Sequence, residues 1–264
     1  MKAINTYVIN LDGSESRLAD ISRSLDAYGM AFERVPAVDG RKFDLNALPD
    51  YNPEAARRFM GRGLVGGEIG CYYSHLKAAR TFLQSDARYA LVLEDDARPL
   101  CDVKALLSTA LPDIEVIDPD WLLLNIGHKR LKLGTTLDGY QVGNRTFNLT
   151  AAHYFPMTTS AIVWSRKGAE RFVADHATIF ASVDNFFRYW LTREGHGYCF
   201  WPAPVTTSGA DSLILTNAGA SRQSGDRSWT YAWVRQKRLL VEKFLAWRHK
   251  RHFERRRKRA SRET

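Results

Sequence analysis

Cysteine is scarce in this 264-residue sequence, which contains only Cys71, Cys101 and Cys199. An odd, sparse set without C-x-x-C spacing argues against a disulfide framework and is typical of a reducing compartment. Long apolar runs are also missing. The short run at residues 7–9 cannot form the core of a signal peptide, and no run reaches the roughly 20 residues that cross a bilayer. We therefore expect a cytoplasmic protein.

A net positive charge is missing from most of the chain, although the formal net charge of the whole chain is +9. Residues 235–264 hold 13 Lys or Arg against three Glu, a local balance of +10, so the other 234 residues carry about −1. The basicity belongs to the C-terminal tail. This distribution weakens any claim that the body of the protein binds a polyanion.

The most informative stretch is an apolar run that ends in three acids. Residues 89–93 read as a short buried strand, and Glu94, Asp95 and Asp96 follow it directly. Ligands collect beyond the carboxyl ends of strands in open α/β sheets, and adjacent carboxylates repel one another unless a cation or a proton intervenes. Hard oxygen ligands suit Mg²⁺ or Mn²⁺, which bridge carboxylates to phosphates. The alternative is a strand end followed by a solvated acidic turn.

The N-terminal segment predicts a βαβ unit and hence a parallel sheet. Residues 4–11 read as a strand, residues 14–25 as a helix that Gly29 closes, and residues 32–35 as a second strand. Four polar side chains lie near these strand ends or in the first helix, where they either contact a nucleotide or serve as turn and cap residues: Asn10, Asp12, Arg17 and Asp39.

A glycine-rich stretch at residues 61–70 opens a helix that runs to about residue 83. Such an entry brings backbone N–H groups towards an anion, but a flexible loop or tight packing explains it as well, and it matches neither nucleotide-binding glycine motif. Glu68, Ser74 and His75 are candidates to line the crevice as hydrogen-bonding groups. Glu68, Cys71 and His75 share a helix face, but nothing nearby in the sequence supplies the fourth ligand or open position of a zinc site.

The rest of the chain alternates further strands and helices before a basic end. Pro99 and Asp102 introduce a helix that we expect to run to about residue 111. Residues 121–125, 158–164 and 198–202 read as strands, whereas residues 126–156 read as strand fragments and turns. We expect a catalytic domain at 1–215, a small-residue linker at 216–228 and a basic amphipathic tail at 229–264. Tryptophans at helical spacing in that tail favour an anionic membrane surface over nucleic acid.

With these residues in view, the sequence resembles glycosyltransferase family 25, which includes bacterial lipopolysaccharide and lipooligosaccharide galactosyltransferases and collagen-modifying relatives. The resemblance covers about residues 4–205 and rests on V-I-N-L at 8–11 with Arg17, G-E-I-G-C at 67–71 with Ser74 and His75, and L-V-L-E-D-D at 91–96. Departures occur at Leu18 and Ile162, where the family has arginine and tyrosine.

The resemblance implies a GT-A-like single Rossmann-type domain with a mostly parallel central sheet, followed here by the basic helix. It implies a UDP-sugar donor and Mn²⁺ or Mg²⁺ held by Glu94 and Asp96, with Asp95 beside them. Asp184 matches a late family aspartate and is the candidate base, although an aspartate that caps the next helix is equally consistent.

On this resemblance we expect a galactosyltransferase that acts on a lipid-linked saccharide at the cytoplasmic face of a bacterial inner membrane. A divalent ion would stabilise the departing nucleoside diphosphate. Two alternatives stay open: a metal-dependent nucleotidyltransferase, and a non-enzymatic adaptor that binds membrane or nucleic acid.

Overall fold

A computed structural model describes residues 4–175, 178–209 and 231–263 of the chain. Its central element is an eight-stranded sheet with the order β2-β1-β3-β8-β5-β9-β7-β6. The strands of this sheet, in chain order, are β1 Ile4–Asn10, β2 Glu33–Pro36, β3 Tyr89–Glu94, β5 Leu123–Asn125, β6 Thr135–Val142, β7 Arg145–Ala151, β8 Ala161–Ser165 and β9 Gly197–Trp201. A separate pair joins β4 Ala97–Pro99 to β10 Val205–Thr207.

The sheet is mostly parallel, as expected. Strand β1 pairs in parallel with β2 and β3, and β5 pairs in parallel with β9. Only β8 and β7 run against the other strands of this sheet, since β8 is antiparallel to both β3 and β5, and β7 to both β9 and β6. The carboxyl ends of β1 and β3 therefore meet at one edge.

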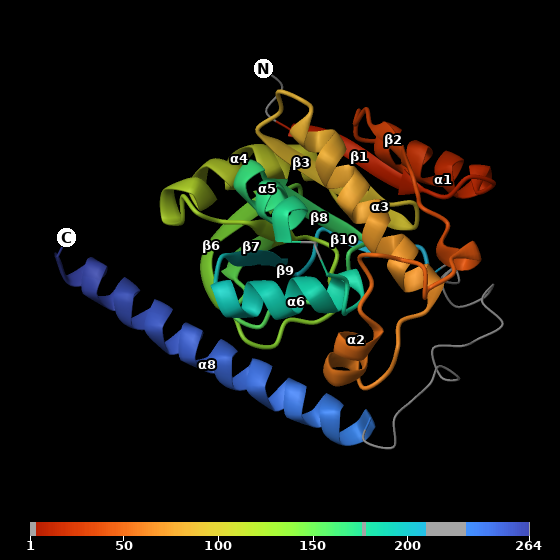
Figure 1. Ribbon diagram of the computed structural model, residues 1–264. Helices are drawn as coiled ribbons and strands as arrows, with labels where there is room; N and C mark the ends of the chain where they lie inside the picture. The colour runs from red at the N-terminus through yellow and green to blue at the C-terminus, as the bar shows by residue number, and fades with distance from the viewer. Residues whose placement is uncertain (1–3, 176–177, 210–230, 264) are drawn as a thin grey trace.

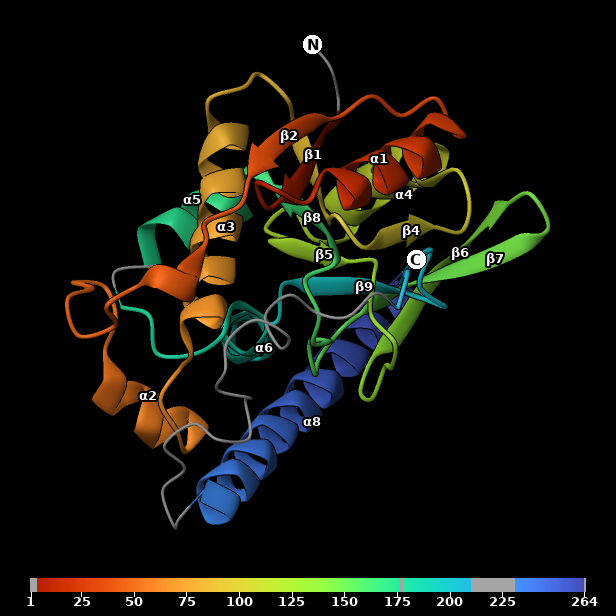
Figure 2. The same cartoon turned by 90° about the vertical axis from the view of Figure 1, so that its right-hand side faces the viewer.

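Helices cover both faces of the sheet (Figures 1 and 2). The helices are α1 Glu15–Asp26, α2 Pro53–Met60, α3 Gly66–Leu83, α4 Val103–Ile117, α5 Arg166–Asp175, α6 Val183–Glu194 and α8 Tyr231–Glu263, with a 3₁₀ turn η1 at Gly40–Lys42. Side chains alternate along β1, so Tyr7 and Ile9 join the core beneath α3, α5 and α6, whereas Val8 joins the core beneath α1 and α4. Because helices cover both faces of the sheet, side chains on both sides of β1 and β3 are buried, which explains the unbroken apolar runs in these strands.

Two segments differ from the sequence-based expectation. Residues 126–156, expected as fragments and turns, contain the long hairpin of β6 and β7 at one end of the sheet (Figure 2). Helix α4, expected to end near residue 111, continues through Pro112 to Ile117. Ile114 is fully buried on this extra turn, and burial of that apolar side chain favours continuation of the helix.

Helix α8 packs against the rest of the protein across α2 and α6 (Figure 1). Its Arg238 donates to the carbonyl of Phe59 at 3.4 Å, and its Arg257 donates to the carbonyl of Thr136 at 3.0 Å. The expected linker at 216–228 lies outside the described residues, and the expected domain boundaries stay predictions. None of the described helices combines the length and the apolar character of a membrane-spanning segment.

Candidate functional site

The register of the parallel strands brings distant polar residues together. Ile9 pairs with Glu94, so Asn10 and Asp95 leave the sheet side by side although they are 85 positions apart. Asn10 Nδ2 donates to Asp95 Oδ2 at 2.9 Å, and Arg17 of α1 forms an ion pair with Asp95 Oδ1 at 2.6 Å. Both carboxylate oxygens of Asp95 therefore have a partner within the protein, one an amide and the other a guanidinium.

A cavity of about 150 Å³ lies at this edge. Most of the sequence-predicted site residues line it: Arg17, Asp39, Ser74, His75, Glu94, Asp95 and Asp96. Pockets for whole drug-sized ligands run to several hundred Å³. This volume is smaller than that of a pocket for a whole nucleotide sugar.

Glu94 and Asp96 differ from Asp95 in their partners. Glu94 Oε1 lies 3.1 Å from His75 Nε2 and accepts a hydrogen bond from Thr159 Oγ1 at 2.6 Å. Burial alone would raise the pKa of Glu94, but these hydrogen bonds outweigh it and lower that pKa. Asp96 has no ion pair within the described residues, and its Oδ1 is buried without a hydrogen-bond partner.

The chemistry of Asp96 fits a cation ligand. Burial, reinforced by the neighbouring charge of Glu94, raises the pKa of Asp96 from 3.8 to about 6. An orphaned buried carboxylate oxygen costs free energy unless an ion or a proton occupies the position beside it. Hard carboxylate oxygens suit Mg²⁺ and Mn²⁺. Glu94 and Asp96 therefore form a donor set that fits a divalent metal.

A softer donor set adjoins these carboxylates. Cys71 and His75 lie one turn apart on α3, and their ligand atoms and one from Glu94 all lie within 4.8 Å of one another. The sequence had grouped Cys71 and His75 with Glu68. In the structure the third member is Glu94 of β3, which provides the only carboxylate of the group, and no sequence spacing reveals this contact.

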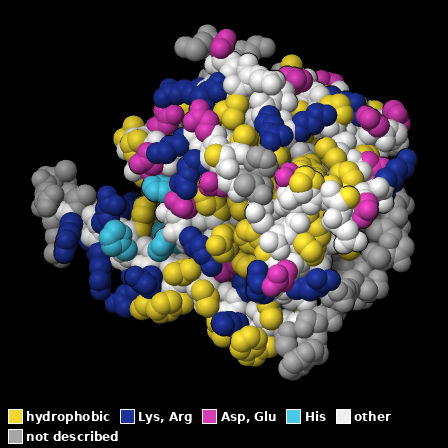
Figure 3. Space-filling model, in the orientation of Figure 1, with side chains coloured by type: hydrophobic (Ala, Val, Ile, Leu, Met, Phe, Trp, Pro, Cys, Tyr) yellow, Lys and Arg dark blue, Asp and Glu magenta, His cyan; other side chains and the backbone are white. Residues whose placement is uncertain are grey.

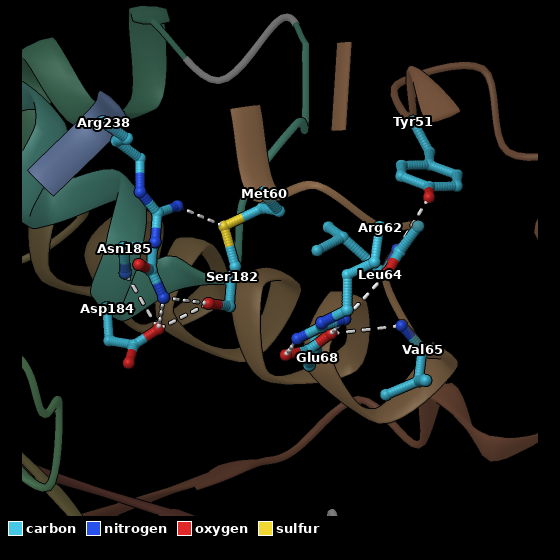
Figure 4. A network of polar contacts seen from close by, with 11 residues as sticks. Tyr51, Met60, Arg62, Leu64, Val65, Glu68, Ser182, Asp184, Asn185 and Arg238 are labelled. Carbon is cyan, nitrogen blue, oxygen red and sulfur yellow. Dashed lines mark hydrogen bonds and ion pairs between the residues drawn. The ribbon is translucent and has the colours of Figure 1, made fainter. Parts of the chain in front are cut away.

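Glu68 is placed away from the cavity. Its carboxylate forms a two-pronged ion pair with Arg62, at 2.7 and 2.8 Å, and accepts from the Val65 N–H at 3.2 Å (Figure 4). The side chains of Arg62 and Glu68 are only 7% and 2% exposed. This geometry fixes the entry of α3, so Glu68 has a folding role in the structure.

Tight packing accounts for two glycines at this helix entry. A Cβ on Gly66 would lie 2.1 Å from the carbonyl oxygen of Gly40, and a Cβ on Gly70 would lie 2.5 Å from that of Val38. Helix α3 therefore approaches the segment around η1 closely. Ser74 reinforces this approach, because its hydroxyl accepts from the Val38 N–H at 2.8 Å and donates to the Gly70 carbonyl at 2.7 Å. Of the glycines in the 61–70 stretch, Gly67 lines the cavity.

Asp39 and Arg41 pair with each other at the cavity mouth. Arg41 donates to both carboxylate oxygens of Asp39, at 2.7 and 2.6 Å, and this contact lowers the pKa of Asp39 to about 2. Asp39 also accepts from the Arg41 N–H as the N-cap of η1. Two residues here were not predicted from the sequence. Arg41 is a cation that lines the cavity, and Thr159 donates a hydrogen bond to Glu94.

Asp184 does not belong to the residues that line this cavity. It lies in the first turn of α6, where its Oδ1 accepts from Ser182 Oγ at 2.6 Å and from the Asn185 N–H at 2.8 Å (Figure 4). These contacts stabilise the helix start. They also hold the carboxylate in a fixed orientation.

Comparison with known proteins identifies the family of this chain. The profile of glycosyltransferase family 25, described as LPS biosynthesis protein, matches residues 3–187. The chain therefore belongs to glycosyltransferase family 25.

Curated relatives include procollagen galactosyltransferase 2 of Mus musculus, 29% identical over 68% of this chain and 29% of that protein. A glycosyltransferase 25 family member of Aedes aegypti is 30% identical over 66% of this chain and 28% of its own length. This chain thus spans about three-tenths of these relatives. A crystal structure of a glycosyltransferase involved in glycosylation of the major capsid of PBCV-1 covers 80% of this chain and 94% of its own, with a TM-score of 0.39 and 11% identity, too distant to relate individual residues.

Proposed function

We propose that this protein is a metal-dependent glycosyltransferase that transfers galactose from UDP-galactose to a lipopolysaccharide- or lipooligosaccharide-type acceptor. The observation that carries the proposal is the buried, unpartnered Oδ1 of Asp96 in a cavity that Glu94 and Arg17 also line. Membership of the family and the galactosyltransferase names of its relatives support the reaction class and the sugar.

Each cavity residue has a distinct role in this proposal. Glu94 and Asp96 hold Mn²⁺ or Mg²⁺, which supplies Lewis-acid stabilisation to the diphosphate leaving group. Asp95 keeps Arg17 in place at 2.6 Å, and Asn10 fixes Asp95. Arg41, which is paired with Asp39, contributes guanidinium N–H donors for the donor phosphates, while His75 and Thr159 orient Glu94.

The transfer breaks the bond between the sugar anomeric carbon and the diphosphate oxygen, and it forms a bond from that carbon to an acceptor hydroxyl oxygen. In an inverting transfer the hydroxyl proton passes to a base, and UDP leaves. Asp184 is the base we propose, on the family resemblance at this position. Asp184→Asn preserves the size of the side chain, so it should abolish transfer to acceptor while slow donor hydrolysis persists.

Acceptors of this class are carried on lipid. We therefore propose a peripheral location on the cytoplasmic face of a bacterial inner membrane, with nucleic acid not a partner.

Release of UDP from UDP-galactose in the presence of Mn²⁺ tests the proposal. We expect turnover that requires the metal and disappears in Asp96→Ala. Release of pyrophosphate from nucleoside triphosphates would instead assign a nucleotidyltransferase, and no turnover with any nucleotide sugar would contradict the transferase assignment.

A further inference from the structure

Helix α8 presents two opposite faces with different surroundings. Glu242 and Ala246 are 2% and 0% exposed, and Arg238 precedes them by one turn, so this face lies against the body. At 100° per residue, Trp233, Leu240, Phe244 and Trp247 fall on the opposite face. The packed face and the aromatic face are therefore separate, and the core of the protein does not use the aromatic one.

The aromatic face is exposed to an unusual degree. Exposed fractions are 65% for Trp233, 65% for Leu240, 57% for Phe244 and 45% for Trp247, and Val241 at its margin is 44% exposed. Scattered exposed apolar residues are ordinary, but a continuous stripe of large ones marks an interaction surface. Phe244 and Trp247 also stack on each other, with ring centroids 6.2 Å apart.

Basic side chains interleave with this stripe. Lys237 lies over the Trp233 ring with its nitrogen 5.1 Å from the centroid, and Arg251 lies over the Trp247 ring at 4.7 Å. Figure 3 shows apolar and basic side chains alternating along the helix. Because residues 235–264 carry +10 and the rest of the chain about −1, this surface is a local concentration of positive charge.

We infer that the outward face of α8 binds the surface of an anionic lipid bilayer. Tryptophan and phenylalanine insert at the boundary between headgroups and acyl chains, while lysine and arginine contact anionic headgroups on the same face. A bilayer thus satisfies both kinds of side chain at once. The inference rests on the proposed function in one respect, since it places the catalytic body beside a lipid-linked acceptor.

Two other occupants fit less well. A second copy of the chain would cover the apolar stripe, but it would bring two helices of charge +10 together. Nucleic acid would match the charge and stack on the tryptophans, but it offers Leu240 and Val241 no apolar environment. The mixture of aliphatic, aromatic and basic side chains favours lipid.

Vesicle flotation of the full chain tests the inference. We expect binding to vesicles of phosphatidylcholine with about one third phosphatidylglycerol, weak binding to phosphatidylcholine alone, and release by salt. Phe244→Ser combined with Trp247→Ser should lower the partition coefficient more than tenfold. Leu100→Ser combined with Val116→Ser is the matched control, because those residues are 39% and 84% exposed and lie outside the stripe.

Charge is tested separately. Lys237→Glu should lower partitioning at least about fivefold, whereas Lys104→Glu on α4 should leave it unchanged. Mn²⁺-dependent UDP release measured without vesicles should be the same in every one of these variants. Flotation therefore measures lipid binding, and UDP release measures transferase activity, so the loss of one can be distinguished from the loss of the other.

Three results would overturn the inference. One is equal flotation of the stripe variant and the Val116 control. Another is a chain mass in light scattering that doubles in the wild type and returns to one copy in the stripe variant, without vesicle binding. The third is oligonucleotide binding that the stripe variant loses, again without vesicle binding.

Discussion

The acidic edge of the sheet and the C-terminal helix depart from the usual distribution of side chains in opposite directions. At the edge, the Oδ1 atom of Asp96 is buried without a hydrogen-bond partner. On α8, Trp233 and Leu240 are each 65% exposed. Each departure costs free energy in the isolated chain, because a buried carboxylate loses hydration and an exposed indole orders water.

The difference teaches where to look for ligands in this molecule. A buried polar atom without a partner indicates a small, charged ligand, whereas an exposed apolar stripe indicates an extended, apolar one. Glu68 provides the contrast within the same fold. Glu68 is more deeply buried than Asp96, at 3% exposed, but Arg62 pairs with its carboxylate, so Glu68 indicates no ligand.

Asp96→Ala should have the largest effect on the acidic edge. We expect Mn²⁺-dependent UDP release to fall about 10³-fold, equivalent to about 4 kcal/mol, because the metal loses a ligand and the leaving group its stabilisation. Thermal unfolding should be unchanged or shifted upwards, since an unpaired buried carboxylate is removed. Asp86→Asn, on an exposed turn before β3, is the control and should keep full activity. Full activity in Asp96→Ala would mean that the unpartnered oxygen of Asp96 does not indicate a metal ligand.

Arg62→Ala should have the next largest effect, and it concerns stability. Removal of the guanidinium leaves Glu68 buried without its cation, which should lower the free energy of unfolding by about 3 kcal/mol. Arg58→Ala breaks an exposed ion pair with Glu54 and should change the free energy of unfolding by less than about 0.5 kcal/mol. Urea denaturation measures both. Equal effects of the two substitutions would mean that burial does not distinguish Glu68 from a surface carboxylate.

A pH titration sharpens the same comparison. The pKa of Asp96 is raised from 3.8 to about 6, so protons compete with the metal below pH 6. The affinity for Mn²⁺ should fall up to about tenfold per pH unit below that value and level off above pH 7. The free energy of unfolding of the metal-free protein should depend on pH in the opposite direction. It should decrease as pH rises from about 4 to about 6, because the folded protein binds the proton of Asp96 more tightly than the unfolded chain does. An affinity that does not change between pH 5 and 7.5 would contradict the assignment of Asp96 as ligand.

The smallest effect is expected on α8. Phe244→Ser should change the free energy of unfolding by less than about 0.5 kcal/mol, because the side chain is 57% exposed. Ala246→Leu, on the packed face two residues away, should cost about 2 kcal/mol through overpacking against the body. A large loss from Phe244→Ser would mean that the stripe supports the fold, and the comparison between the two regions would fail.

Local sequence patterns predicted much of this fold. The apolar runs gave β1 and β3, and helical spacing gave α1 and α3, within a residue or a few of the observed bounds. The hairpin of β6 and β7 was not predicted, because its outer strand β6 is largely exposed and holds Thr, Asp, Gly and Gln in place of an apolar run. The continuation of α4 past Pro112 depends on tertiary burial of Ile114, which no local pattern reports.

The acids of the site were predictable because they follow the end of a strand. The contacts that each acid makes with residues of other elements were not predictable. Glu94, Asp95 and Asp96 were recognisable because three acids follow an apolar run. Their different states depend on Arg17, His75 and Thr159, which reach them across the parallel register and from other elements. For the same reason Glu68 was grouped with the crevice, since its partner Arg62 could not be inferred from spacing.

Binding of Mn²⁺ measured by electron paramagnetic resonance, with and without UDP, tests the central claim most directly. We predict that UDP tightens the binding of one Mn²⁺ per chain, and that Asp96→Ala abolishes this ion whereas Asp86→Asn retains it. UDP binding of equal strength with and without Mn²⁺, or a bound ion that survives Asp96→Ala, would contradict the assignment of Glu94 and Asp96 as a metal site for a departing diphosphate.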